Sequence, residues 1–141
     1  MSDAPRDLVI VGAGAAGMAA AAVAGELGLS VTVFDEQPTP GGQIYRSIDE
    51  VRAKRADDLS LLGDDYAVGG KLTDTFRAAD IDYRPNSTVW QIEENGTTWS
   101  TDGARAESVR AKFILLATGA MERPMPIPGW TLPGVTTVGA G

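Results

Sequence analysis

Residues 8–35 read LVIVGAGAAGMAAAAVAGELGLSVTVFD, and this stretch decides the fold. The apolar run 8–11 predicts a buried strand that passes directly into glycines spaced GxGxxG. An alanine-rich segment then predicts a helix, and a second apolar run, 31–34, predicts a strand that ends on the acidic Asp35. A strand, a glycine turn, a helix and a second strand at this spacing predict a βαβ unit with parallel strands.

Each glycine of the fingerprint has a mechanical role. Gly12 permits the tight turn out of the strand, Gly14 lets a pyrophosphate approach the backbone, and Gly17 lets the helix pack closely on the sheet. The phosphates would then lie on the N–H groups of the first helical turn, which includes Ala16. The carboxylate of Asp35 is expected to accept hydrogen bonds from an adenosine ribose. The alternative is a βαβ unit rich in alanine and glycine that binds no ligand.

Composition narrows the possible functions. The chain has 141 residues and a formal net charge of −7, and it contains no cysteine and no histidine. The acidic balance argues against nucleic acid and anionic membrane surfaces as partners. The missing residue types exclude disulfides, iron–sulfur clusters, Cys/His zinc sites and a Ser-His-Asp triad within these residues, so no metal site is predicted. Any redox chemistry must come from a bound organic cofactor.

Residues 9–23 are apolar enough to suggest a membrane span or a signal peptide. The stretch is too short and too rich in glycine for a span. Asp3 and Asp7 offset Arg6, so there is no clear basic leader. We therefore expect a soluble, cytoplasmic chain.

Residues 36–46, EQPTPGGQIYR, predict a loop at the carboxyl edge of the sheet, where ligands of open α/β folds bind. Gly42 could allow close approach of a cofactor. Gln43 offers an amide that both donates and accepts, and Arg46 offers a phosphate contact. The alternative for this segment is a plain surface turn.

The middle of the chain, 47–86, is charged and predicts helices at 49–58 and 71–79, followed by a third strand at 81–84. The next part predicts an antiparallel meander with strands at 89–93, 97–101 and 108–112, because Asn95-Gly96 and Asp102-Gly103 are hairpin turn sequences. A buried parallel strand is then expected at 113–117, and the Pro/Gly-rich tail is expected to cross over and leave the domain.

Two long motifs carry a family resemblance. Residues 35–46, DEQPTPGGQIYR, and 117–135, ATGAMERPMPIPGWTLPGV, resemble the FAD/NAD-binding α subunits of amino-acid and opine dehydrogenases. Opine oxidase, hydrogen cyanide synthase and dye-linked proline dehydrogenase subunits belong to that branch of the two-dinucleotide-binding flavoproteins, which also include glutathione and thioredoxin reductase. The resemblance implies an α/β fold: a Rossmann-like parallel sheet with an inserted antiparallel β-meander.

The resemblance also implies the site. In this family the glycines would hold the FAD pyrophosphate, Asp35, Glu36 and Gln37 would lie at the adenosine ribose, and Gly42 and Gln43 at the flavin side. The backbone of Val89 would meet the adenine. The implied cofactor-binding positions are Gly12, Gly14, Ala16, Gly17, Asp35, Glu36, Gln37, Gly42, Gln43, Val89, Ala117, Thr118 and Gly119. No catalytic residue is assigned.

The resemblance further implies that residues 1–141 are the N-terminal part of an incomplete FAD domain. Its parts would be the fingerprint and PGGQ loop (1–46), the helical region with the third strand (47–86), the meander with the ATG strand (87–119) and the crossover tail (120–141). A full member continues into an NAD-type domain and then adds a last strand beside 113–117. One flank of that strand is thus expected to be unpaired.

The implied function is the FAD-binding part of an oxidoreductase subunit that oxidises an amino-acid-like or opine substrate. Its expected partners are the remaining C-terminal part, a second flavoprotein subunit or a further copy of the chain. Two alternatives stay open: an NAD-binding Rossmann module, and a truncated remnant that acts only through a partner.

Overall fold

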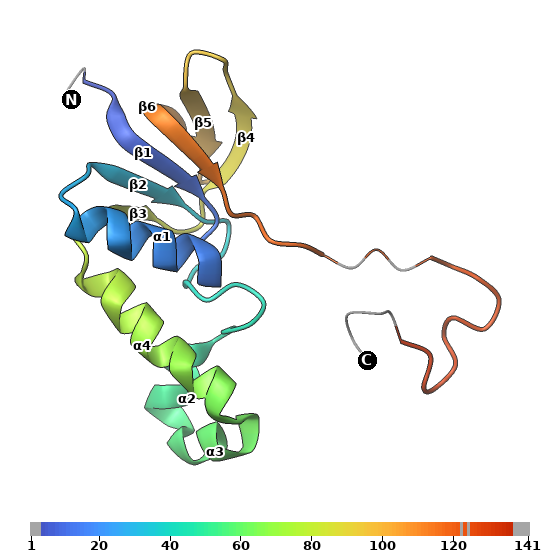
Figure 1. Ribbon diagram of the computed structural model, residues 1–141. Coiled ribbons are helices and arrows are strands. Elements are labelled where there is room, and N and C mark those ends of the chain that lie inside the picture. The colour runs from blue at the N-terminus through green and yellow to red at the C-terminus, as the bar shows by residue number, and fades with distance from the viewer. Residues whose placement is uncertain (1–3, 122, 124, 137–141) are drawn as a thin grey trace.

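The computed structural model describes residues 4–121, 123 and 125–136 (Figure 1). Along the chain the elements are β1 (Arg6–Val11), α1 (Ala15–Glu26), β2 (Val31–Phe34), α2 (Ile48–Lys54), the 3-10 helix η1 (Ala56–Asp58), α3 (Leu59–Leu62), α4 (Asp64–Ala78), β3 (Asp82–Arg84), β4 (Thr88–Ile92), β5 (Thr97–Thr101) and β6 (Ala106–Leu116).

The strands form one six-stranded sheet in the order β3-β2-β1-β6-β5-β4. The pairs β3–β2, β2–β1 and β1–β6 are parallel, whereas β6–β5 and β5–β4 are antiparallel. Ile10 of β1 lies opposite Val33 on one side and Leu115 on the other. The expected combination of a Rossmann-like parallel sheet and an antiparallel meander is therefore confirmed.

The two faces of β1 carry separate apolar clusters, because successive side chains of a strand point to opposite faces. Ile10 faces α1 and α4, where it joins a buried cluster that includes Met18, Val33 and Phe76. Val9 points to the other face and packs in a second cluster with the meander. Both Val9 and Ile10 are fully buried, so β1 is the central strand of the molecule.

The expectation of two separate strands at 108–112 and 113–117 is wrong. Strand β6 runs without interruption over 11 residues. Its first half pairs with β5 up to Arg110, and its second half pairs with β1 from Ala111 to Leu116. No turn residue separates Lys112 from Phe113, so the strand changes partner without ending. Among the described residues no strand pairs with the second edge of 113–116.

The helix boundaries also differ from those expected. Helix α2 ends at Lys54 and is followed by η1, in place of one helix over 49–58. Helix α4 begins at Asp64 rather than at residue 71. Its start fits the sequence, because Asp64 and Asp65 lie in the first turn, where negative charge is favourable. The pair Gly69-Gly70 resembles a helix break, but tertiary contacts hold it within α4.

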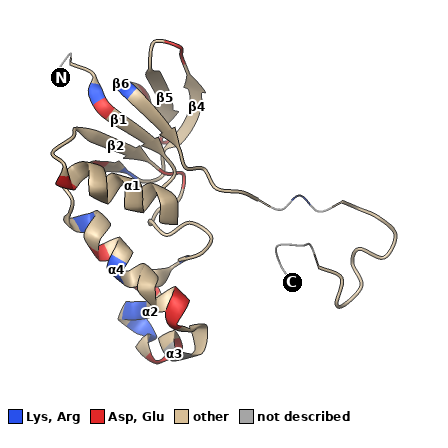
Figure 2. Cartoon of the chain, in the orientation of Figure 1, with Lys and Arg blue, Asp and Glu red and all other residues tan. Residues whose placement is uncertain are grey.

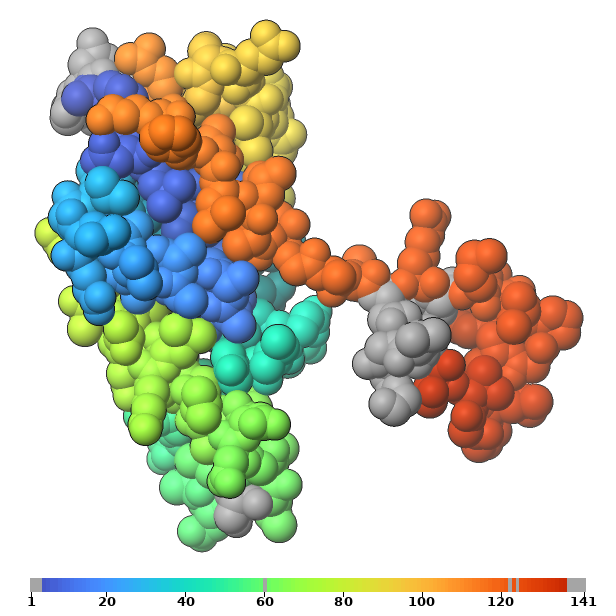
Figure 3. Space-filling view, in the orientation of Figure 1, coloured from blue at the N-terminus to red at the C-terminus, as the bar shows by residue number. Residues whose placement is uncertain are grey.

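Charged residues are frequent on α2, η1 and α4, whereas α1 carries a single acidic residue at its end (Figure 2). Beyond β6 the described part of the tail carries no helix or strand and runs outward from the body (Figure 3). Within the described part of the chain, no helix has the length and apolar character that crossing a membrane requires.

Candidate dinucleotide-binding site

The turn between β1 and α1 requires glycine at two positions. Gly12 has φ +104°, and a Cβ there would overlap the carbonyl oxygen of Ala117. A Cβ at Gly17 would overlap the carbonyl oxygen of Gly12 and would lie 3.4 Å from the Ala117 Cβ. The main-chain N–H of Gly12 donates to the Phe34 carbonyl at 2.7 Å. The glycine turn, the end of β2 and the end of β6 are thus packed into one corner.

The N-terminus of α1 is suited to bind an anion. Its N-cap is Gly14, no side chain caps the helix, and its first turn contains no acidic residue. The first N–H groups of a helix lack intrahelical partners and carry partial positive charge. Gly14 has φ −74°, and a Cβ there would meet nothing nearer than the Gly42 Cα at 3.9 Å. Ala16 is exposed in the first turn.

The predicted loop after β2 lies against this turn. The N–H of Gly41 donates to the Ala13 carbonyl at 2.9 Å, and Gly41 forms a parallel bridge with Gly14. Gly42 has φ +61°, and its Cβ would come within 2.8 Å of the Gly14 Cα. In Figure 1 this segment, drawn in turquoise, passes the N-terminal end of α1. The two glycine motifs therefore form one backbone surface.

Asp35 is buried at the end of β2, with 7% of its surface exposed. One carboxylate oxygen accepts a short hydrogen bond from the N–H of Ala13, and the other accepts from the N–H of Gln37 at 2.7 Å. Its carboxylate thus ties the glycine turn to the loop. The expected ribose contact by Asp35 stays a prediction, and each oxygen already has a main-chain donor.

The neighbouring polar side chains point outward. Glu36 and Gln37 are exposed, and the amide of Gln37 lies 3.4 Å from a carboxylate oxygen of Glu36. Gln43 is also exposed and accepts a 2.5 Å hydrogen bond from Arg46. The exposed carboxylate of this region is therefore that of Glu36, next to the buried Asp35.

The ATG motif lies on the opposite side of the glycine turn. The N–H of Ala117 donates to the Val11 carbonyl at 2.9 Å, which extends the β1–β6 ladder into the motif. Thr118 and Gly119 are exposed, and Gly119 has φ +71°. Val89 is half-buried on β4, where it packs on the second core cluster. No hydrogen bond among the described residues joins Val89 to the ATG motif.

Sequence reasoning missed residues that act through their backbone. The turn 85–87 joins the end of β2, since Ser87 N–H donates to the Asp35 carbonyl at 2.8 Å and Asn86 N–H donates to the Gln37 carbonyl at 3.1 Å. Its asparagine, with φ +53°, was the signal available in the sequence. Within the described residues no cluster of three or more His, Cys, Asp or Glu could hold a metal ion.

Known proteins resemble the chain in both sequence and fold. It is 46% identical over 142 residues to an opine oxidase subunit of Agrobacterium tumefaciens (strain Ach5), a match over 95% of this chain and 28% of that protein. It is 41% identical over 134 residues to hydrogen cyanide synthase subunit HcnB of Pseudomonas aeruginosa, a match over 93% of this chain and again 28% of the relative. The chain thus spans little more than a quarter of these relatives.

Solved structures share the fold. L-proline dehydrogenase from P. horikoshii superposes with a TM-score of 0.65 at 21% identity, over 86% of this chain and 24% of that one. The flavoprotein disulfide reductase RclA of Escherichia coli gives a TM-score of 0.62 at 18% identity, over 93% of this chain and 32% of that one. The family model for pyridine nucleotide-disulphide oxidoreductases matches residues 6–139. The chain belongs to the pyridine nucleotide-disulphide oxidoreductase family.

Proposed function

We propose that residues 1–141 bind FAD as the N-terminal part of an oxidoreductase subunit. The observation that carries the proposal is the uncapped N-terminus of α1 beside the bare backbone of Gly14. Helix N-termini with glycine at the approach position bind the pyrophosphate of a dinucleotide. The family match over residues 6–139 supports the same assignment.

In this proposal different residues bind different parts of FAD. The backbone of Gly12, Gly14, Ala16 and Gly17 holds the pyrophosphate, and the exposed carboxylate of Glu36 accepts hydrogen bonds from the adenosine ribose. Asp35 acts indirectly, by fixing the Ala13 and Gln37 backbones on either side.

The remaining predicted positions are assigned to the adenine, the ribose and the flavin side. Val89 offers its backbone to the adenine, and Gln37 flanks the ribose carboxylate. The flavin side belongs to Gly42 and Gln43, with Ala117, Thr118 and Gly119 closing the corner. When bound, FAD would supply the capacity to accept a hydride, which no side chain of this chain can provide. We assign no catalytic residue to the chain itself.

The whole subunit is proposed to oxidise an opine or another amino-acid-like substrate. This rests on relatives whose names specify opine oxidase and sarcosine oxidase subunits, of which this chain matches 28% and 15% respectively. Its partners would be the rest of the subunit or a second subunit. The edge of β6 at 113–116, which no described strand pairs with, is compatible with such a partner.

Titration with separate ligands tests the cofactor. Purified chain would be titrated with FAD, ADP and NAD by isothermal calorimetry, and any co-purified ligand would be released by denaturation and identified by mass spectrometry. We expect FAD and ADP to bind to a single site and FAD to exclude ADP. Finding NAD alone in that site would replace the proposal with a nicotinamide-binding module. Binding of none of them would leave a remnant that acts only through a partner.

A further inference from the structure

Helix α4 packs along one face against both α1 and the loop after β2. Gly69, Thr73 and Phe76 lie on this face at helical spacing and are buried. The hydroxyl of Thr73 donates to the Gly69 carbonyl at 2.9 Å and lies 4.0 Å from the sulfur of Met18 in α1. The second half of α4 is thus fixed on α1, the helix whose N-terminus forms the candidate site (Figure 1).

The first half of α4 contacts the loop of residues 41–46. The ring of Tyr45 lies directly on the helix backbone at Gly69, where a Cβ would overlap the ring and come within 2.8 Å of its Cε1 atom. One turn earlier in the helix, the hydroxyl of Tyr66 donates to the Arg46 carbonyl at 2.7 Å. Only glycine at position 69 leaves room for this ring.

The same loop contacts the glycine turn on its other side. Gly41 binds the Ala13 carbonyl and Gly42 packs on Gly14, as described above. The N–H of Tyr45 donates to the Gly41 carbonyl at 3.1 Å and closes the loop into a compact turn. Tyr45 therefore links α4 to the glycine turn: its ring contacts α4 directly, and its N–H reaches the turn through Gly41. The exposed Gln43 lies between Gly41 and Tyr45 in the loop.

We propose that Tyr45, seated on Gly69, is a positioning residue that fixes Gly42 and Gln43 over the N-terminus of α1 and so sets the affinity for the part of the dinucleotide beyond the pyrophosphate. The inference rests on the proposed FAD function. A loop held before the ligand arrives saves the cost of ordering it on binding. ADP lacks the flavin half, so in the proposed site it binds through the glycine turn, the ribose carboxylate and the adenine position, and makes no contact on the flavin side.

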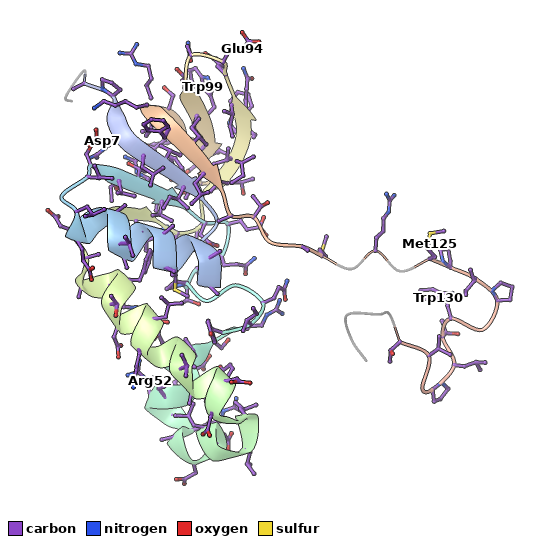
Figure 4. The ribbon with its side chains drawn as sticks, in the orientation of Figure 1. Asp7, Arg52, Glu94, Trp99, Met125 and Trp130 are labelled. Atoms are coloured by element: carbon purple, nitrogen blue, oxygen red, sulfur yellow. The ribbon has the colours of Figure 1, made fainter. Side chains whose placement is uncertain are left out.

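The test compares two adjacent glycines of α4. Gly69→Ala places a methyl group in the Tyr45 ring. The matched control, Gly70→Ala, has the same effect on helix propensity, but the atoms nearest to its methyl group belong to the side chain of Arg52, at 3.0 Å. Arg52 lies on the helical arm, where its guanidinium donates to exposed Asp74 and, at 3.2 Å, to the Gly70 carbonyl (Figure 4). The control therefore perturbs a long side chain on the arm and leaves the Tyr45 ring untouched. Each variant of the 141-residue chain would be titrated with FAD and with ADP.

We expect Gly69→Ala to weaken FAD by at least about tenfold while ADP changes by less than about twofold, and Gly70→Ala to change neither. Tyr45→Phe, which keeps the ring, should retain wild-type affinity for both ligands. If Gly69→Ala does not fold, the double variant Tyr45→Ala/Gly69→Ala removes the overlap and should show the same selective loss of FAD.

Two results would overturn the inference while leaving the proposed function in place. One is unchanged FAD affinity in Gly69→Ala or in the double variant. The other is an equal loss of FAD and ADP, which would make the Tyr45–Gly69 contact merely structural. A wild-type chain that binds neither ligand would instead remove the proposed function, and this inference with it.

Discussion

The buried carboxylate of Asp35, at the end of β2, accepts a hydrogen bond from the main-chain N–H of Ala13, in the turn between β1 and α1. Its second oxygen accepts from the Gln37 N–H at 2.7 Å. One side chain therefore supports both the glycine turn and the loop that follows β2. This carboxylate therefore both fixes the backbone of the candidate site and stabilises the fold.

Asp35→Asn should destabilise the protein. The amide keeps the volume but places an N–H group opposite a main-chain donor, so a buried donor loses its acceptor. Such a loss costs about 1–3 kcal/mol, and we expect the free energy of unfolding to fall by about that amount. Urea unfolding followed by circular dichroism would measure it. Glu36→Gln, at an exposed neighbour, is the control and should stay within about 0.5 kcal/mol of wild type.

Glu36→Ala should weaken ligand binding without changing stability. If this exposed carboxylate accepts ribose hydrogen bonds, its removal costs about 1.5–3 kcal/mol, which is roughly tenfold or more in affinity. Because the ribose is common to FAD and ADP, both affinities should fall by a similar factor in calorimetric titrations. Unchanged ADP affinity would mean that Asp35 binds the ribose instead, or that no carboxylate contacts it.

Gly14→Ala and Gly12→Ala should separate binding from folding. Gly14 has an ordinary φ and free space at its Cβ position, so the alanine variant should fold normally while its methyl group blocks the approach of a pyrophosphate. Gly12 has φ +104° and faces the Ala117 carbonyl, so its variant should lose stability first. Thermal melting and FAD titration would be measured for each. Equal loss of stability in both variants would make Gly14 a purely structural glycine.

The sequence predicted the elements that depend on local pattern. The strands at 31–34 and 97–101 have the expected bounds because a short apolar or alternating run and its turn residues define them without other information. The continuity of β6 was missed, since its change of partner from β5 to β1 depends on how distant strands meet. The start of α4 was missed because Gly69 and Gly70 disfavour a helix until Tyr45 and Arg52 pack on them.

The candidate site divides in a similar way. The structural roles of Gly12 and Gly17 could be predicted because they depend on spacing along one βαβ unit. The bond from Ala13 to Asp35 could not, because its donor is a main-chain N–H, which no side-chain motif reveals. The same holds for Tyr45, whose contact on Gly69 joins the loop to a helix that begins later in the chain.

Asp7 should make the stability of the fold depend on pH. Its carboxylate bonds to the ammonium of Lys112 at 2.6 Å and to the N–H and hydroxyl of Ser30, and these bonds hold its pKa well below the ordinary value (Figure 4). A carboxyl whose pKa is lowered in the folded state stabilises it above the pKa of the unfolded chain, about 3.9, and loses this effect as the pH falls below it. The stability difference between wild type and Asp7→Asn should therefore be largest near neutral pH and shrink toward pH 2. A difference that does not change with pH would contradict this, and Lys112→Met should reproduce part of the loss at neutral pH.

The exposed apolar row on β6 should drive association of the chain with itself. Phe113 and Leu115 pair with Leu8 and Ile10 of β1, so they lie on the face of the sheet that α1 covers over β1 and β2. Phe113 is 71% exposed and Leu115 38%, so this face of β6 is largely uncovered. Contiguous exposed apolar residues next to an unpaired strand edge favour association.

Light scattering should give an average mass that rises with concentration and that falls in the double variant Phe113→Lys/Leu115→Lys. Leu61→Lys, at an 83% exposed position on α3, is the control and should behave like wild type. A wild-type chain that stays monomeric at all concentrations would contradict the prediction. A Leu61 variant that lowers the average mass equally would assign the association to another surface.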